Sequence, residues 1–160
     1  MKNFQNKAKI VKFSKIIRSI LFAGLILWII AIPGLLAAFF LPIFFHSNTH
    51  TTADTYKGVG AILMLPFVFA ANLYFFKFFD RLKNGHLFDA QTIGYLETAG
   101  KWLIAIGLFQ ALFSGVEGLI THSQNITFSG DGIFSGLVTI FTAWLFREGQ
   151  ELQEEQELTV

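Results

Sequence analysis

The feature that most constrains this chain is a run of 27 residues, 19–45, without a single charge. At about 1.5 Å of helical rise per residue the run is about 40 Å long, which exceeds the roughly 30 Å hydrocarbon core of a bilayer. Basic residues precede the run, as in a signal peptide. The run is about twice as long as a signal-peptide core, however, and no small-residue cleavage site follows it. We therefore predict an uncleaved membrane anchor.

Three shorter apolar segments predict three further crossings, over about 58–76, 102–120 and 130–146. The last is short for a crossing, because its 14 uncharged residues at 133–146 extend only about 21 Å. The chain is 53% hydrophobic and 14% charged, whereas soluble domains are about 25% charged. Because backbone groups in lipid must bond internally, the spans should be α-helices. The predicted fold is all-α: one integral membrane domain over residues 1–160, built as a four-helix bundle.

Basic residues are distributed unequally between the two sides of this domain. The segment before the first span, the segment 77–101 and the tail 147–160 together hold 11 of the 12 Lys and Arg residues. By the positive-inside rule these segments are cytoplasmic. The sequence therefore predicts a multi-pass protein of a bacterial inner membrane with both termini in the cytoplasm. Its basic residues should meet anionic lipid headgroups rather than nucleic acid.

The segment 77–101 is expected to form a cytoplasmic helical hairpin. Asn84-Gly85 is typical of a helix end, and Asp89 is a good N-cap for the helix that continues into the third span. The tail 147–160, with five Glu and one Arg, predicts an acidic helical extension. It either solubilises the chain, pairing with the basic segments, or docks a cytoplasmic protein. The candidate docking residues are Arg81, Lys83, Phe88, Asp89, Glu148, Leu152, Glu154, Glu155, Leu158 and Val160.

The turn and the tail also carry a family resemblance. The turn reads Gly85-His86-Leu87-Phe88-Asp89, and the chain ends with Phe146-Arg147-Glu148-Gly149 and then Leu152-Gln153-Glu154-Glu155-Gln156-Glu157-Leu158-Thr159-Val160. With four spans, this pattern resembles the YoaS-like proteins, small bacterial membrane proteins classified as a domain of unknown function. The resemblance covers most of the chain. It implies an inner-membrane protein encoded beside an Xre-type helix-turn-helix regulator, and it implies no catalytic residues.

Small and polar residues predict that spans three and four are neighbours. Gly107, Ala111, Gly115 and Gly118 form a small-residue ridge on the third span, beside a polar stripe of Gln110, Ser114, Glu117 and Thr121. The fourth span offers Gly132 and Gly136 as small residues, and Ser135, Thr139 and Thr142 as a polar face. Antiparallel packing is expected to place Ser135 near Glu117 and Thr142 near Gln110.

Two intramembrane side chains have alternative roles. Glu117 is an acidic residue within the third span. It either stabilises a helix interface or forms part of an ion, proton or ligand site. Asn72 is expected to make a hydrogen bond between helices rather than to contact a ligand. On the outer side, His46, His50, Asp54, His122 and Asp131 could supply nitrogen and oxygen ligands, but their spacing matches no metal signature, so no metal site is predicted.

Several classes of function are excluded or lack support. The chain has no cysteine, which excludes a thiol enzyme and a disulfide scaffold. It also lacks a nucleophile elbow, a phosphate-binding loop and a dinucleotide fingerprint, so we predict neither catalysis nor a cofactor. The favoured function is a non-enzymatic membrane protein that tethers or regulates a cytoplasmic partner, for which an Xre-type regulator is the candidate. The alternative is a subunit of a small homo-oligomeric transporter or channel, using Glu117, Gln110 and Asn72.

Overall fold

The computed structural model describes residues 2–44, 52–86, 89–121 and 130–158 of the chain. These residues form four helices: α1 (Lys2–Phe44), α2 (Thr52–Lys83), α3 (Ala90–Thr121) and α4 (Asp131–Leu158). The prediction of an all-α fold with four helices is therefore confirmed. The segment 77–83, in which charged and apolar residues are mixed, continues α2 without a break, and 90–101 is the first part of α3.

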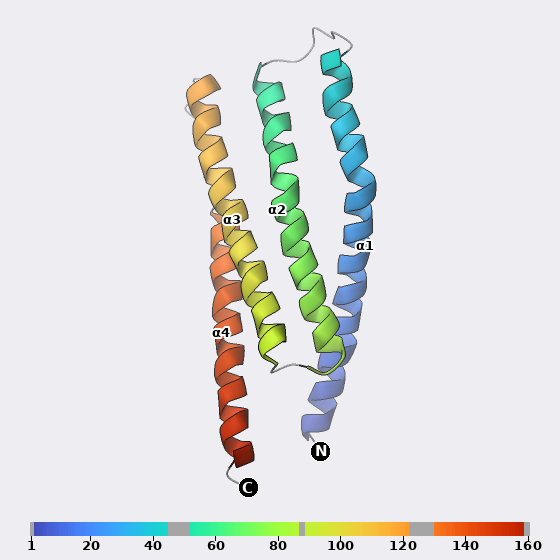
Figure 1. Cartoon of the computed structure of the whole chain (residues 1–160), viewed down its shortest axis with the longest axis vertical. Coiled ribbons are helices and arrows are strands. Elements are labelled where there is room, and N and C mark those ends of the chain that lie inside the picture. Colours follow the sequence, from blue (N-terminus) through green and yellow to red (C-terminus); the bar gives the residue numbers. More distant parts are fainter. Residues whose placement is uncertain (1, 45–51, 87–88, 122–129, 159–160) are drawn as a thin grey trace.

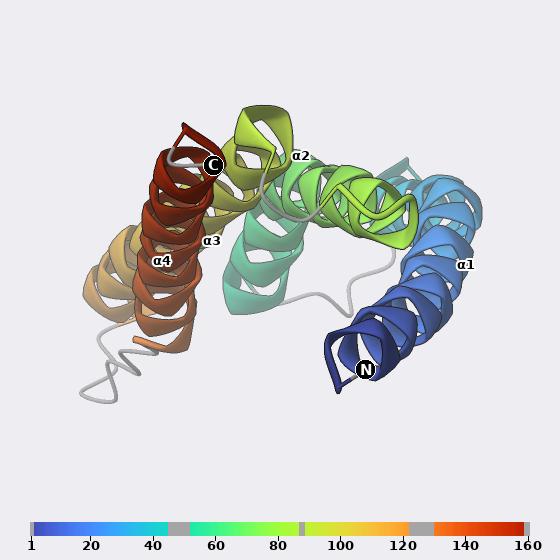
Figure 2. The same cartoon turned by 90° about the horizontal axis from the view of Figure 1, so that it is seen from below.

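The helices stand in an open, curved row and do not close into a bundle (Figures 1 and 2). In the described part of the chain, α1 packs on α2, α2 on α3, and α3 on α4, and no other pair packs along its length. The helices α1 and α4 therefore lie at opposite ends of the row (Figure 2). Of the predicted four-helix bundle, the four helices are present, but the first and the last do not pack on each other. In lipid, an apolar helix face gains little free energy when protein replaces the lipid tails around it. An apolar sequence therefore does not by itself require the helices to close into a bundle.

Many large apolar side chains, especially on α1 and α4, are exposed. On α1, Leu27, Ile29 and Ile30 are each more than 60% exposed, and on α4 Phe134 is 70% exposed. Such extensive apolar exposure is unfavourable in water and natural in lipid. Within the described residues, three stretches are long and apolar enough to cross a membrane: Lys9–Gly34, Gly58–Lys83 and Ala90–Leu119.

The helix α4 is not among these three stretches. Its uncharged part, residues 132–146, contains 15 residues and extends about 22 Å, less than the hydrocarbon thickness. A fourth crossing over 130–146 therefore stays a prediction.

The start of α1, the α2–α3 turn and the end of α4 lie at the same end of the molecule, which we call the turn end (Figure 1). The best-packed core of the protein is also at the turn end. Its members come from α2, α3 and α4 and are all less than 10% exposed: Phe78, Leu82, Ile93, Leu96 and Ala143. Phe75, Phe79, Tyr95 and Phe146 pack against them. This core holds three helices in a fixed arrangement at the turn end.

Local signals in the sequence specify the α2–α3 turn. The backbone amides of Asn84 and Gly85 donate to the carbonyls of Arg81 and Leu82 at 3.0 Å, which ends α2. Gly85 has a φ of 86°, in the left-handed region that glycine adopts without a steric penalty. The carbonyl of Asp89 accepts a bond from the amide of Ile93 at 3.0 Å, as an N-cap residue does. The predicted helix end and helix start are both confirmed.

Glycines bring the backbones of α3 and α4 into direct contact. A Cβ atom placed on Gly132 would lie 2.9 Å from the Cα of Gly107, and one on Gly136 would lie 2.7 Å from the carbonyl oxygen of Gly100. Gly107, Gly132 and Gly136 thus make the small-residue contact that the sequence predicts. Gly115 does not take part, because a Cβ on it would meet nothing within 4 Å.

The register of α3 against α4 differs from the prediction. Gly132 lies against Gly107, and Gly136 lies against Gly100 and Ile104. Ser135 is therefore near the level of Ile104, about three and a half helical turns from Glu117. Thr142 is likewise far from Gln110. The prediction placed the polar stripe of α3 against the polar face of α4. In the structure the glycines of the two helices face each other instead, because only glycine lets the two backbones approach this closely.

Candidate interaction surface at the turn end

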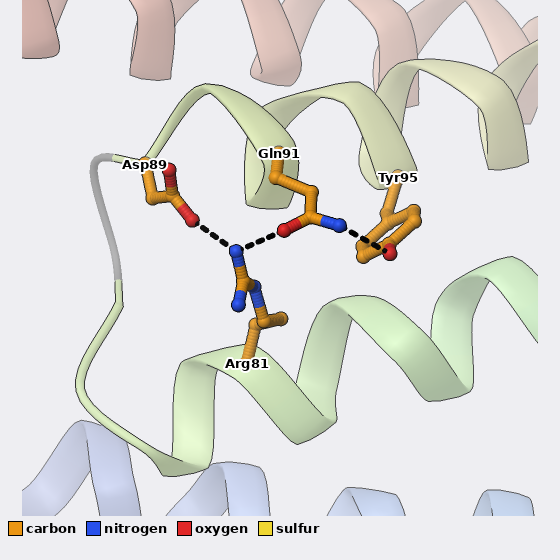
Figure 3. Close-up of polar contacts among 4 residues, drawn as sticks. All are labelled: Arg81, Asp89, Gln91 and Tyr95. Atoms are coloured by element: carbon orange, nitrogen blue, oxygen red, sulfur yellow. Dashed lines mark hydrogen bonds and ion pairs between the residues drawn. The ribbon is translucent and has the colours of Figure 1, made fainter.

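Arg81 ties the end of α2 to the start of α3. Its Nη2 atom lies 2.5 Å from Oδ2 of Asp89 and also donates to the side-chain oxygen of Gln91 (Figure 3). Gln91 in turn donates from Nε2 to the hydroxyl of Tyr95 at 2.9 Å. Nη2 carries two hydrogens, so this one nitrogen can donate to both acceptors at once. Arg81 therefore fixes the shape of the turn.

Further ion pairs connect neighbouring helices close to this turn. Nε of Arg18 on α1 lies 2.7 Å from Oδ1 of Asp80 on α2. On α3, Glu97 lies 2.7 Å from Nζ of Lys101 and 2.9 Å from Nη2 of Arg147 on α4. These pairs are partly exposed, so each contributes at most about 1 kcal/mol to stability. Their main effect is to position the charged parts of all four helices at the turn end.

Two basic side chains near the turn end, those of Lys77 and Arg18, lie against aromatic rings. Nζ of Lys77 lies 5.2 Å from the ring centre of Tyr74 and 5.7 Å from that of Tyr95. The guanidinium carbon of Arg18 lies 5.3 Å from the ring centre of Phe76. Basic residues beside aromatic rings are typical of the boundary between lipid and water.

Beyond Arg147, α4 continues as an acidic helix past the α2–α3 turn (Figure 1). This α4 extension, residues 148–158, is about 16 Å long. Residues 151–156 are all exposed, and Leu152 is 54% exposed although it is apolar. Gln150 donates to Glu154 at 2.9 Å along one side of the helix. The extension is therefore a charged surface that includes an exposed leucine.

The structure divides the ten predicted docking residues between two places. Arg81, Lys83 and Asp89 lie at the α2–α3 turn, and Glu148, Leu152, Glu154 and Glu155 are exposed on the α4 extension. Leu158 is the last residue of α4. Phe88 and Val160 lie outside the described residues. The docking role of these residues stays a prediction.

The predicted pairing of the acidic tail with the basic segments stays a prediction. The ion pair that joins the two regions has the opposite polarity, because Arg147 of α4 binds Glu97 of α3. In the described residues, α1 and α4 do not pack on each other, so the basic start of α1 and the acidic extension are not neighbours.

Sequence reasoning missed several of these contacts. Glu97 and Lys101 are four residues apart on one helix, a spacing that predicts their ion pair. Gln91 and Tyr95 have the same spacing. The pair between Arg18 and Asp80 has no comparable signal, because it depends on which face of α1 packs against α2.

The turn gives a direct test of the role of Arg81. Replacing Arg81 by alanine should lower the stability of the detergent-solubilised protein by about 1 kcal/mol and its thermal midpoint by a few degrees, because Asp89 and Gln91 lose a shared, partly exposed donor. Arg81→Lys should recover only part of the loss, since its ammonium is a strongly hydrated charge on a flexible stem and is less preorganised than a guanidinium. Lys83 makes no ion pair among the described residues and serves as the control. Equal losses for Arg81→Ala and Lys83→Ala would contradict this role.

The polar residues that are predicted to lie in the membrane mostly bond to their own helices. Asn72 donates to the carbonyl of Val68 at 3.0 Å, so the predicted bond between helices is replaced by one within α2. Thr139 and Thr142 donate to the carbonyls of Ser135 and Val138 at 2.7 and 2.8 Å, also within one helix. These bonds satisfy the hydroxyls without a partner helix.

The polar stripe of α3 lies beyond the start of α4. Gln110 reaches α2, where its Nε2 lies 3.9 Å from Sδ of Met64, while Ser114 and Glu117 are half-buried. Because α4 begins near the level of Gly107, it does not cover this stripe. The structure does not bring Asn72 to the stripe either, and the role of Glu117 stays a prediction.

Metal binding has no support in the part of the chain that the structure describes. No group of three or more His, Asp or Glu side chains there could hold an ion. The predicted solvated residues His46, His50 and His122 lie outside the described residues.

The fold and the charges define the class of this protein: an all-helical chain with three helices long and apolar enough to cross a membrane, and ion pairs gathered at one end. Residues 46–160 match the family described as protein of unknown function DUF2975, so the chain belongs to this family. The matching segment contains α2, α3 and α4 and leaves α1 outside it. No curated protein and no solved structure matches the chain.

Proposed function

We propose that this chain is a non-enzymatic protein of a bacterial inner membrane that docks a cytoplasmic protein at its turn end. The observation that carries the proposal is the α4 extension. An acidic helix with an exposed Leu152 projects past a turn end that is fixed by a packed core and by Arg81. A rigid base with a projecting, charged helix suits protein recognition. The proposal includes four crossings, with the α2–α3 turn and both termini in the cytoplasm.

The chemistry of the extension indicates what kind of partner it suits. Five glutamates without a basic residue after Arg147 favour a basic surface. DNA-binding proteins carry such a surface for the phosphate backbone. The resemblance to the YoaS-like proteins, which is part of this proposal, suggests an Xre-type helix-turn-helix regulator. Docking on the extension would hold such a regulator at the membrane and compete with DNA for its basic surface.

A binding experiment with a defined probe tests this proposal. The full chain in detergent or nanodiscs should retain the purified Xre-type regulator encoded next to its gene. Deletion of residues 148–160 should abolish retention. Neutralising Glu151, Glu154 and Glu155 to glutamine should weaken it strongly and reduce its salt dependence, since fewer charges attract the partner.

A matched control separates charge from helix length. Changing Gln153 and Gln156 to alanine keeps both the helix and its charge, so this variant should bind like the original chain. If the chain lacking 148–160 recovers as much regulator as the full chain, the docking proposal fails.

A further inference from the structure

Each edge helix of the row has an outward face with an apolar stripe. On α1 the stripe contains Ile16, Ile26, Leu27 and Ile30, and on α4 it contains Phe134, Val138, Phe141 and Leu145; all eight side chains are between 43% and 70% exposed. The two helices lie at opposite ends of the row, so each packs along its length on only one neighbour in the described part of the chain (Figure 2). Both edges are therefore open to a further helix.

Near the turn end, the outward face of α1 carries positive charge. Ser14, which is 1% exposed, marks the side of α1 that faces α2. At about 100° per residue, Lys9 and Lys12 lie on the opposite side of the helix. Both are exposed. The outward edge of α1 is therefore basic at the turn end and apolar above it.

The outward face of α4 carries the opposite charge. Ala143, with no exposed surface, marks the side of α4 that faces α3. Glu148, Leu152 and Glu155 lie roughly on the opposite side and are exposed. Because α2 and α3 stand between α1 and α4, these glutamates and the lysines of α1 do not meet within one chain.

We propose that a second copy of this chain covers each edge, with α4 of one copy packed against α1 of the next. Both copies would have their turn ends on the same side of the membrane, which brings Lys9 and Lys12 of one copy to Glu148 and Glu155 of the other. Pairing of identical edges is disfavoured, because it places lysine against lysine or glutamate against glutamate. Such a head-to-tail contact repeats and gives a ring or an open array.

This inference goes beyond the proposed function and does not need the cytoplasmic partner. Gln150 and Glu154 lie on the same side of α4 as the face that packs on α3, but beyond the end of that contact. When another copy covers the outward side with Leu152 and Glu155, docking would use the side with Glu154; in a single chain both sides are available.

Cross-linking in membranes tests the proposal, and the absence of cysteine from the chain makes it specific. One tagged chain carries Ile16→Cys on the outward face of α1, and a second, differently tagged chain carries Leu152→Cys on the outward face of α4. After co-expression, a short bifunctional thiol reagent should join the two different chains several-fold more than it joins like chains. A chain with Asn84→Cys, exposed in the α2–α3 turn, is the control.

Charge reversal shows whether the lysines and glutamates direct the contact. Lys9→Glu with Lys12→Glu in the Ile16→Cys chain should lower the mixed cross-link several-fold. Glu148→Lys with Glu155→Lys in the Leu152→Cys chain should restore it, which requires both chains to be inserted and folded. High salt should weaken the original cross-link as well.

Four outcomes would overturn the proposal. In the first, the mixed cross-link is no stronger than that of the Asn84→Cys control; in the second, cross-links between like positions dominate. In the third, the reversal of the glutamates does not restore the cross-link lost on reversal of the lysines. In the fourth, a single chain that carries both cysteines is cross-linked to itself. The last outcome would mean that the row closes on itself.

Discussion

Replacing Gly136 by valine is expected to separate α3 from α4 and to lower the stability of the solubilised protein more than any surface substitution. A Cβ on Gly136 would lie 2.7 Å from the carbonyl oxygen of Gly100 and 2.8 Å from the amide nitrogen of Ile104. These are backbone atoms, so no side-chain rotation relieves the overlap. Overpacking costs about 1–3 kcal/mol, and contact with a rigid backbone favours the upper part of that range or more. Thermal unfolding in detergent measures the loss.

Gly115 provides the matched control for this substitution. It lies in α3, and a Cβ on it would meet nothing within 4 Å. Because alanine loses less backbone entropy than glycine in a helix, Gly115→Ala should leave stability unchanged or raise it by up to about 1 kcal/mol. If Gly136→Val and Gly115→Ala change the thermal midpoint equally, close backbone packing does not hold α4 to α3.

The glycine contact also affects the proposed interaction surface. With α4 displaced from α3, Arg147 can no longer stay 2.9 Å from Glu97, and Ala143 leaves the core at the turn end. The α4 extension would then project from a mobile helix. Packing in the apolar part of the molecule thus positions a charged surface at its end.

Local sequence signals predicted the helices and the turn well. The Asn84-Gly85 pair ends α2, and Asp89 starts α3, because these choices depend on the conformations of a few neighbouring residues. The glycine contact was also partly predictable, since Gly107, Gly132 and Gly136 recur on one side of each helix. Such signals need no knowledge of the rest of the fold.

The arrangement of the helices was harder to predict. The register of α3 against α4 depends on which glycines meet, and the sequence offered several, including Gly115, which has no close neighbour. The open row was not predictable because apolar faces in lipid give no signal about which of them meets a helix. For the same reason the ion pair between Arg18 and Asp80 was missed.

A reporter enzyme that is active only outside the cytoplasm is expected to be inactive when it is fused after Val160. The uncharged part of α4 is shorter than the hydrocarbon core, which leaves the number of crossings open if length alone is considered. The geometry gives a second argument. α4 runs antiparallel to α3, and Arg147 binds Glu97, so the end of α4 lies at the turn end with the start of α1 (Figure 1).

The positive-inside rule then assigns the turn end to the cytoplasmic side of the membrane, because the segments that meet there hold 11 of the 12 basic residues. The same reporter fused after Gly130 in a chain that lacks α4 should be active, because the segment before α4 is predicted to lie outside. The contrast between the two fusions should be nearly all-or-none, since a reporter domain is either exported or retained. Activity after Val160 would place the acidic α4 extension outside the cytoplasm and would remove the basis for docking a cytoplasmic protein there.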